Sequence, residues 1–168
     1  MAGRASLIQG IDLGSSTALS SVNLASLPIG AVVGQTWEQD GKAYKLVQFD
    51  SGSGPVASVA GGAAMYTDTT LTEVTMDTTD ALSANCVAGG FLTAGVTDGY
   101  YTVIQVGGIQ TGVKVDAGTG VGETLSQGTD GELVSTAVGT ATVNLPVAVA
   151  CTAASGGTAT VKWNAGNL

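Results

Sequence analysis

Alternation of apolar and polar positions, the mark of a strand with one buried face, recurs along the second half of the chain. Apolar residues take alternate positions over residues 143–151 and again over residues 159–163. Pro146 lies on the opposite face of the first segment and has no N–H to donate, so we expect an edge position or a break there. Residues 100–106 are β-branched and aromatic, and residues 112–116 alternate apolar and charged side chains. Short strands joined by Gly-rich turns predict a barrel or a sandwich.

A β-hairpin is predicted within residues 32–49. Asp40-Gly41 separates two β-prone segments, and this dipeptide suits a type I′ turn because both central residues must accept a positive φ. Counting outward from a two-residue loop places Trp37 opposite Tyr44. Such an aromatic cross-strand pair contributes up to about 1 kcal/mol.

The middle of the chain is less regular. Residues 63–80 are Thr-rich and β-prone, whereas residues 77–85 fit either a loop or a single helical turn. Residues 118–122 form a Gly-rich turn cluster, and residues 123–126 lead straight into another turn. No repeat of fixed period occurs, which argues against a β-solenoid.

Residues 1–30 differ from the remainder because they contain no aromatic residue and match neither a strand nor a long helix. We interpret them as an arm and residues 31–168 as a β-rich barrel or sandwich domain. Large apolar side chains in the arm would be unfavourable in water, so we expect them to dock against a partner. The candidate contact residues are Leu7, Ile8, Ile11, Leu13, Leu19, Leu24 and Leu27.

Composition excludes several classes of function. Hydrophobic residues make up 44% of the chain and charged residues 11%, and 26 of the 168 residues are glycine. This balance favours strands and tight turns over surface helices. The net charge of −8, from 13 acidic and 5 basic residues, gives no basic stripe for nucleic acid or for an anionic membrane. The start of the chain lacks the apolar stretch of a signal peptide, so we expect synthesis in the cytoplasm.

Catalytic chemistry is scarce. The chain has no histidine, which excludes Ser-His, Cys-His and His-ligated zinc sites. Asp77 and Asp80, with Asp68 and Glu73 nearby, form the acidic cluster. They could be a glycosidase pair, oxygen ligands for calcium, or solvated turn carboxylates, of which the third is favoured. No cofactor or metal is expected, and the two cysteines, 86 and 151, are expected to be buried thiols rather than a disulfide.

One stretch resembles a known family. Residues 99–108, Gly-Tyr-Tyr-Thr-Val-Ile-Gln-Val-Gly-Gly, resemble a Gly-Tyr-x-x-Val-Gln-Val-x-Gly stretch of head-associated proteins of tailed bacteriophages. Further similar features follow the family's order: the hairpin within residues 34–49, Gly-Glu-Thr-Leu at 122–125, Gly-Glu-Leu-Val at 131–134, a late Val/Ala strand at 147–151 and a small-residue hairpin at 156–161.

The resemblance implies a capsid cement, or decoration, protein. It implies an all-β fold, a small antiparallel β-barrel or sandwich knob with an extended N-terminal arm, and no enzymatic activity. It implies a homotrimer that binds the phage major capsid protein on the outer surface of the virion, after assembly in the host cytoplasm, without contacting nucleic acid or membrane. Alternatives are a head fibre or tail protein, a carbohydrate-binding β-sandwich using Trp37, Tyr44 or Trp163, and a hydrolase using Asp77 and Asp80.

Overall fold

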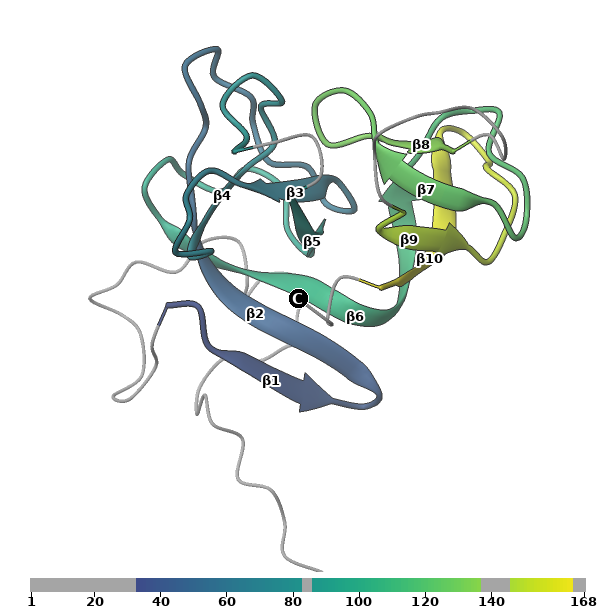
Figure 1. Ribbon diagram of the computed structural model, residues 1–168, viewed down its shortest axis with the longest axis horizontal. Helices are drawn as coiled ribbons and strands as arrows, with labels where there is room; N and C mark the ends of the chain where they lie inside the picture. The colour runs from purple at the N-terminus through teal and green to yellow at the C-terminus, as the bar shows by residue number, and fades with distance from the viewer. Residues whose placement is uncertain (1–32, 83–85, 137–145, 165–168) are drawn as a thin grey trace, which may run out of the picture.

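The computed structural model describes residues 33–82, 86–136 and 146–164 (Figure 1). Every regular element in these ranges is a β-strand, and none of the residues there is helical. The predicted all-β fold class is confirmed, and the chain builds a closed β-barrel with further strands attached. In the same ranges there is no helix of the length and apolarity that crossing a membrane requires. The predicted arm, residues 1–30, lies outside the described residues.

Five strands form the barrel, in the order β2, β4, β3, β5, β6 and back to β2. Pairing of β2 with the first half of β6 closes the barrel. β2 and β4 run parallel, while the other neighbours in the barrel are antiparallel. Closure removes the edges that an open sheet would expose. The bounds are β2 (Lys42–Phe49), β3 (Ala63–Tyr66), β4 (Glu73–Thr75), β5 (Val87–Phe91) and β6 (Tyr101–Lys114).

The second half of β6 leaves the barrel and starts a second sheet, so β6 joins the two parts of the molecule (Figure 1). A parallel bridge between Val115 and Leu133 connects the last strand of this sheet back to the chain just after β6. The second sheet continues from β6 through β10 (Thr158–Trp163), β9 (Ala148–Ala150), β7 (Thr124–Gln127) and β8 (Leu133–Ser135).

The predicted hairpin is confirmed in position and register. β1 (Thr36–Gln39) pairs with β2, and Trp37 lies opposite Tyr44. Asp40 has φ 52° and Gly41 has φ 74°, the positive values that a type I′ turn requires. The two rings stack with centroids 5.7 Å apart and planes at 29°. The local turn chemistry therefore determined the pairing.

Several strand predictions change in extent. Residues 100–106 and 112–116, which the pattern separates, belong largely to the one long strand β6, bent where it passes between the sheets. The alternating segment 143–151 contributes only β9 to the described residues, and residues 143–145 lie outside them. Two strands were missed. Residues 123–126, predicted to lead into a turn, contain most of β7, and the Gly-containing β5 has no alternation because it is buried on both faces.

The cysteines form no disulfide with each other, as predicted. Their predicted burial is wrong, because Cys86 is half-buried and Cys151 is exposed. Cys151 directly follows the last residue of β9, where the chain turns toward β10. The alternation pattern extended the strand one residue too far and so placed this thiol in the core.

The barrel interior holds one hydrophobic core. Phe49 of β2 and Phe91 of β5 meet edge to face, with ring centroids 5.6 Å apart and an interplanar angle of 86°. Ile104 of β6 and Val74 of β4 are fully buried in the same cluster. These side chains come from β2, β4, β5 and β6, so the interior is filled rather than hollow.

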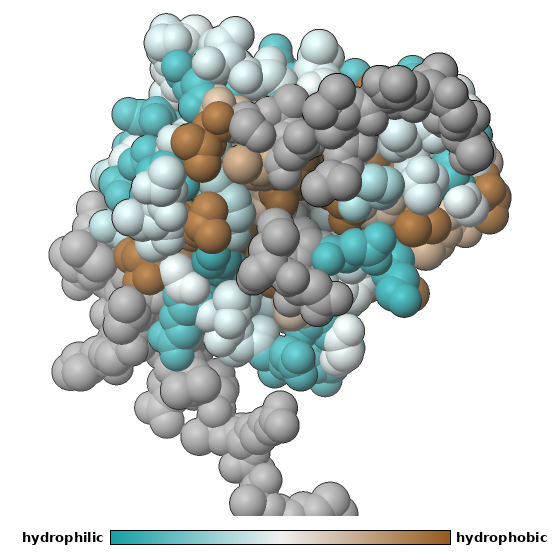
Figure 2. Space-filling view, viewed as in Figure 1, coloured by the Kyte–Doolittle hydropathy of each residue, from teal (hydrophilic) through white to brown (hydrophobic). Residues whose placement is uncertain are grey.

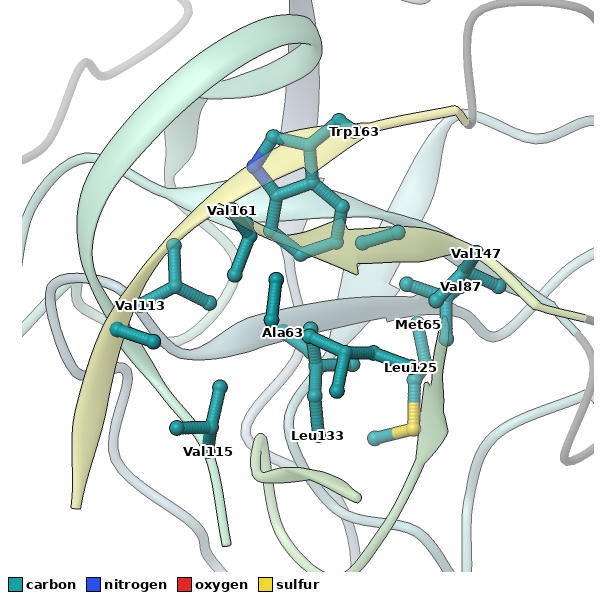
Figure 3. Close-up of a cluster of buried hydrophobic side chains, with 13 residues drawn as sticks. Ala63, Met65, Val87, Val113, Val115, Leu125, Leu133, Val147, Val161 and Trp163 are labelled. Atoms are coloured by element: carbon teal, nitrogen blue, oxygen red, sulfur yellow. The ribbon is translucent and has the colours of Figure 1, made fainter. Parts of the chain in front are cut away.

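A second core lies between the barrel and the second sheet (Figure 3). Ala63, Met65 and Val87 point outward from β3 and β5, whereas Ala64 faces the barrel interior. Figure 3 shows side chains of β3, β5, β6, β7, β8 and β10 converging, among them the fully buried Leu125. Both faces of β3 and β5 are buried, so these two strands contribute side chains to both cores.

A buried polar contact ties the two parts at their junction. The Gln110 side chain of β6 accepts a hydrogen bond from Trp163 Nε1 of β10 at 2.7 Å and donates one to the Phe91 carbonyl of β5 at 3.1 Å. A Cβ at Gly90 would lie 2.4 Å from Gln110 Oε1, so glycine is needed beside this contact. The contact satisfies an indole N–H that would otherwise be buried without a partner.

Candidate functional site

The predicted partner-binding residues all belong to the arm. Leu7, Ile8, Ile11, Leu13, Leu19, Leu24 and Leu27 lie outside the described residues, so they stay a prediction. The structure does show how the first described residues are held. Gly34 N donates to the Leu46 carbonyl at 2.7 Å, and Leu46 N donates to the Gln35 carbonyl at 3.0 Å. The chain just after the predicted arm is thus held along β2.

Gly34 and Gln35 lie beside an aromatic cluster on the outer face of the barrel. Tyr44, Leu46 and Val103 are buried there, and Trp37 and Tyr101 are partly buried against them. Burial, and then the charge of Asp40, raise the pKa of Tyr44, so this phenol stays neutral at physiological pH. The cluster packs the β1–β2 hairpin against the barrel next to Gly34 and Gln35.

The aromatic residues proposed for sugar binding are not arranged as an open platform. Tyr44 is 8% exposed and Trp163 is 3% exposed, and Trp163 lies in the core between the sheets. Trp37 retains partial exposure but stacks on Tyr44. Two of the three candidate rings are therefore used in packing.

Asp77 and Asp80 come together, as the cluster predicted, but they bind backbone. Gly54 N donates to Asp77 Oδ2 at 3.2 Å, and Ser53 N donates to Asp80 Oδ2. Thr79 donates to Asp77 Oδ1 from its hydroxyl at 2.6 Å and from its amide at 2.8 Å. These hydrogen bonds from Thr79 are the main reason that the pKa of Asp77 lies below its usual value. The pair organises the loop at residues 51–54.

Asp68 and Glu73 organise a different loop. Asp68 accepts hydrogen bonds from the amides of Thr72 at 3.2 Å and Glu73 at 3.3 Å, and from the Thr70 hydroxyl. Burial would raise the pKa of Asp68, but the hydrogen bonds outweigh burial and lower it. Within the described residues, no three acidic or cysteine side chains are grouped so that they could hold a metal ion. The Asp77–Asp80 pair and Asp68 therefore each hold a loop in place through hydrogen bonds to its backbone.

Lys45 is engaged at the barrel. Its Nζ donates to the Tyr66 hydroxyl at 2.8 Å and lies 4.7 Å from the Tyr66 ring centroid. Burial lowers the pKa of Lys45, and the negative charge of Asp68 opposes this. Burial raises the pKa of Tyr66 to about 12, with smaller contributions from Asp68 and Cys86. The Lys45 ammonium is therefore already paired with Tyr66 within the barrel.

A groove of about 400 Å³ lies between the β1–β2 hairpin and the end of β10. Lys42 and Lys162 line it, together with Glu38 and Asn164. A second hollow of about 320 Å³ is lined by Gln105, Gln110 and backbone glycines, and Lys42 lines it as well. Neither is lined by Asp77 or Asp80. The two lysines in its lining make the groove suited to contact with a negatively charged side chain.

Sequence reasoning missed the groove. Lys42 and Lys162 are far apart in the chain and meet because β2 and β10 both pair with β6. The only local signal was the alternation that placed Lys162 on the outward face of its strand. Elsewhere the exposed large apolar residues of the described surface are scattered (Val59, Leu82, Tyr100, Ile109 and Val121). Figure 2 shows apolar residues in small separate groups on one face.

Comparisons of the chain with known protein families, with curated proteins and with solved structures find no match.

Proposed function

We propose that this protein is a non-enzymatic structural component of a tailed-phage virion that binds the outer surface of the capsid and cements neighbouring major capsid proteins. The observation that carries the proposal is the anchoring of the chain at Gly34 and Gln35 on β2. This anchoring supports an arm that would start from the barrel wall just before Gly34. A rigid knob with an apolar arm suits a protein that holds other subunits together.

The surface of the knob supports the same proposal. Asp77 and Asp80 accept hydrogen bonds from the loop at residues 51–54, and Asp68 accepts them from its own loop, so each of these carboxylates has a structural role. The net charge of −8 disfavours contact with the packaged genome, because binding nucleic acid requires cationic side chains. Binding to the outer surface of the capsid does not require them.

The mechanism is additive adhesion. Burying one Leu or Ile side chain of the arm contributes roughly 1.5–3 kcal/mol before the cost of ordering the arm. We propose that three copies associate, so that three linked arms engage together and weak contacts add up to high avidity. A shell held in this way resists rupture because cement contacts and capsid contacts must break together.

The test is capsid binding by arm variants. Deleting residues 1–30 should leave a folded protein that no longer coats capsids, measured by cosedimentation with capsids lacking the protein. A finer variant replaces Leu7, Ile8, Ile11 and Leu13 with serine, and its matched control replaces Ala2, Ala5, Ala18 and Ala25 with serine. Loss of two or more buried side chains should weaken binding at least tenfold, since about 1.4 kcal/mol corresponds to a factor of ten. Undiminished coating by the deletion variant would refute the role of the arm.

A further inference from the structure

We propose that the groove between the β1–β2 hairpin and the end of β10 binds the acidic end of the second sheet of another copy of this chain. This contact is between copies and adds to the capsid binding proposed above. It rests on how the few cations of the folded part are placed relative to its many carboxylates.

The groove is lined by the two lysines, among the described residues, whose ammonium groups have no partner there. Of the four lysines there, Lys45 donates to the Tyr66 hydroxyl at 2.8 Å, and Lys114 donates to the Asp130 carbonyl at 3.2 Å. Lys42 and Lys162 have no side-chain partner within the described part of the chain, and both line the groove. The remaining basic residue, Arg4, lies outside the described residues. Two ammonium groups are thus available at one place.

Backbone contacts hold the two lysines in position. A Cβ at Gly108 would lie 2.6 Å from the Gly41 carbonyl oxygen, so the hairpin turn packs directly on β6. Lys162 pairs with Ile109 on β6, which fixes β10 on the other side of that contact. The groove also contains Glu38, so it presents two cations beside one carboxylate. A carboxylate from outside would complete the charge pairing.

The acidic end lies around the far end of β6. Asp116 N donates to the Leu133 carbonyl at 2.8 Å, which brings Asp116 beside the start of β8 and next to Glu132. Asp130 lies at the same end, because its carbonyl accepts the hydrogen bond from Lys114. Asp116 and Asp130 are exposed, and Glu132 is half-buried. These three carboxylates gather near a single lysine, which is already hydrogen-bonded.

The two surfaces lie at opposite ends of the second half of β6, and we propose that the groove of one copy meets the acidic end of the next head to tail. The stretch of β6 from Gly108 to Lys114 spans at most about 20 Å, at roughly 3.3 Å per residue. A head-to-tail arrangement is heterologous, and such contacts generate closed rings or open chains. A closed ring is compatible with the three copies proposed above. Exposed ion pairs are individually weak and screened by salt, so the contact should be populated at high protein concentration and low ionic strength.

Zero-length crosslinking of the purified full-length chain tests the contact directly. A carbodiimide condenses an amine with a carboxylate only where the two already touch. Mixing unlabelled and nitrogen-15-labelled protein at high concentration and low salt identifies the crosslinks between copies by mass spectrometry. We expect intermolecular links from Lys42 or Lys162 to Asp116, Asp130 or Glu132, reduced at least fivefold in about 0.5 M salt because exposed ion pairs are screened. Intermolecular links that ignore these residues, or no such links at all, would overturn the proposal.

Charge reversal provides the second measurement. Lys42→Glu with Lys162→Glu should lower the yield of crosslinked dimer at least fivefold, and adding Asp116→Lys with Asp130→Lys in the same chain should restore it. Lys114→Glu is the control, because it changes the charge on the acidic end and should leave the yield unchanged or higher. An equal loss with Lys114→Glu would show that net charge alone is responsible, and failure of the four-substitution chain to recover would also contradict the contact. No capsid is present in these experiments, so their failure would leave the capsid proposal standing.

Discussion

Replacing the buried Gln110 with leucine should lower the free energy of unfolding far more than the same change at an exposed glutamine. Gln110 is 6% exposed, and its amide bridges Trp163 of β10 and Phe91 of β5. Leucine fills a similar volume but leaves the Trp163 indole N–H without a partner in the core. The Phe91 carbonyl keeps a hydrogen bond from Gly61 N at 2.8 Å, so only one group is left unsatisfied.

The expected loss is about 2–4 kcal/mol. About 1 kcal/mol comes from the lost hydrogen bond to the Phe91 carbonyl and roughly 1–3 kcal/mol from the Trp163 N–H left unpaired in the core. For a chain of this size, each kcal/mol lowers Tm by about 2–4 °C, so the midpoint should fall by roughly 4–16 °C. Denaturant unfolding monitored by tryptophan fluorescence would measure the change in free energy, and calorimetry would measure the change in Tm.

A matched control and a double-mutant cycle make the prediction specific. Gln48→Leu removes a hydrogen bond to the Gly99 carbonyl at an exposed position and should cost less than about 1 kcal/mol. Trp163→Phe combined with Gln110→Leu should cost less than the sum of the two single changes, because both polar groups are then removed. If Gln110→Leu costs no more than Gln48→Leu, or if the cycle shows no coupling, the assigned role of this contact is wrong.

Two further predictions concern the backbone and the charges. Gly61→Ala should destabilise the protein strongly, because Gly61 has φ 79° and a Cβ there would lie 2.0 Å from the Gly112 carbonyl oxygen. Gly156→Ala is the control: a Cβ there would meet no atom within 4 Å, so the change should cost only about 1 kcal/mol. Chemical denaturation of the two variants compares their free energies of unfolding. Hydrogen bonds lower the folded-state pKa of Asp68, and the hydrogen bond from Ser51 N to Asp98 Oδ1 at 2.8 Å lowers that of Asp98. Their stabilisation is therefore complete above about pH 4 and is lost as pH falls through the folded-state pKa values. Unfolding free energies measured from about pH 7 down to about pH 2 should therefore fall below about pH 4, and Asp68→Asn should flatten that fall; an unchanged slope would contradict the assignment.

Much of the all-β character followed from local patterns. The hairpin was predictable because the Asp40-Gly41 turn and the Trp37–Tyr44 pair depend on residues within a few positions of each other. The strand at residues 159–163 was predictable from its alternation, since one face of β10 is buried. The scarcity of charge and the absence of histidine restrict the candidate chemistry through composition alone.

The acidic cluster shows where local reasoning ends. Its residues were identified correctly, but their use depends on a loop at residues 51–54 that is distant in the chain. Alternation could not reveal β5, because both of its faces are buried and it carries two glycines that permit close approach. β7 was missed because its four residues follow a Gly-rich turn and show too little periodicity.

By itself the amino-acid sequence determined the strand-forming segments, the hairpin turn and the lack of proton-transfer histidines, because each depends on residue type or on neighbours in the chain. Only the tertiary structure decided that β2 and β6 close a barrel, that β6 continues into a second sheet, and that Lys42 and Lys162 meet in one groove. These features arise from strand pairings between distant residues. Such pairings are selected by the shared burial of whole faces, which no short window of sequence contains.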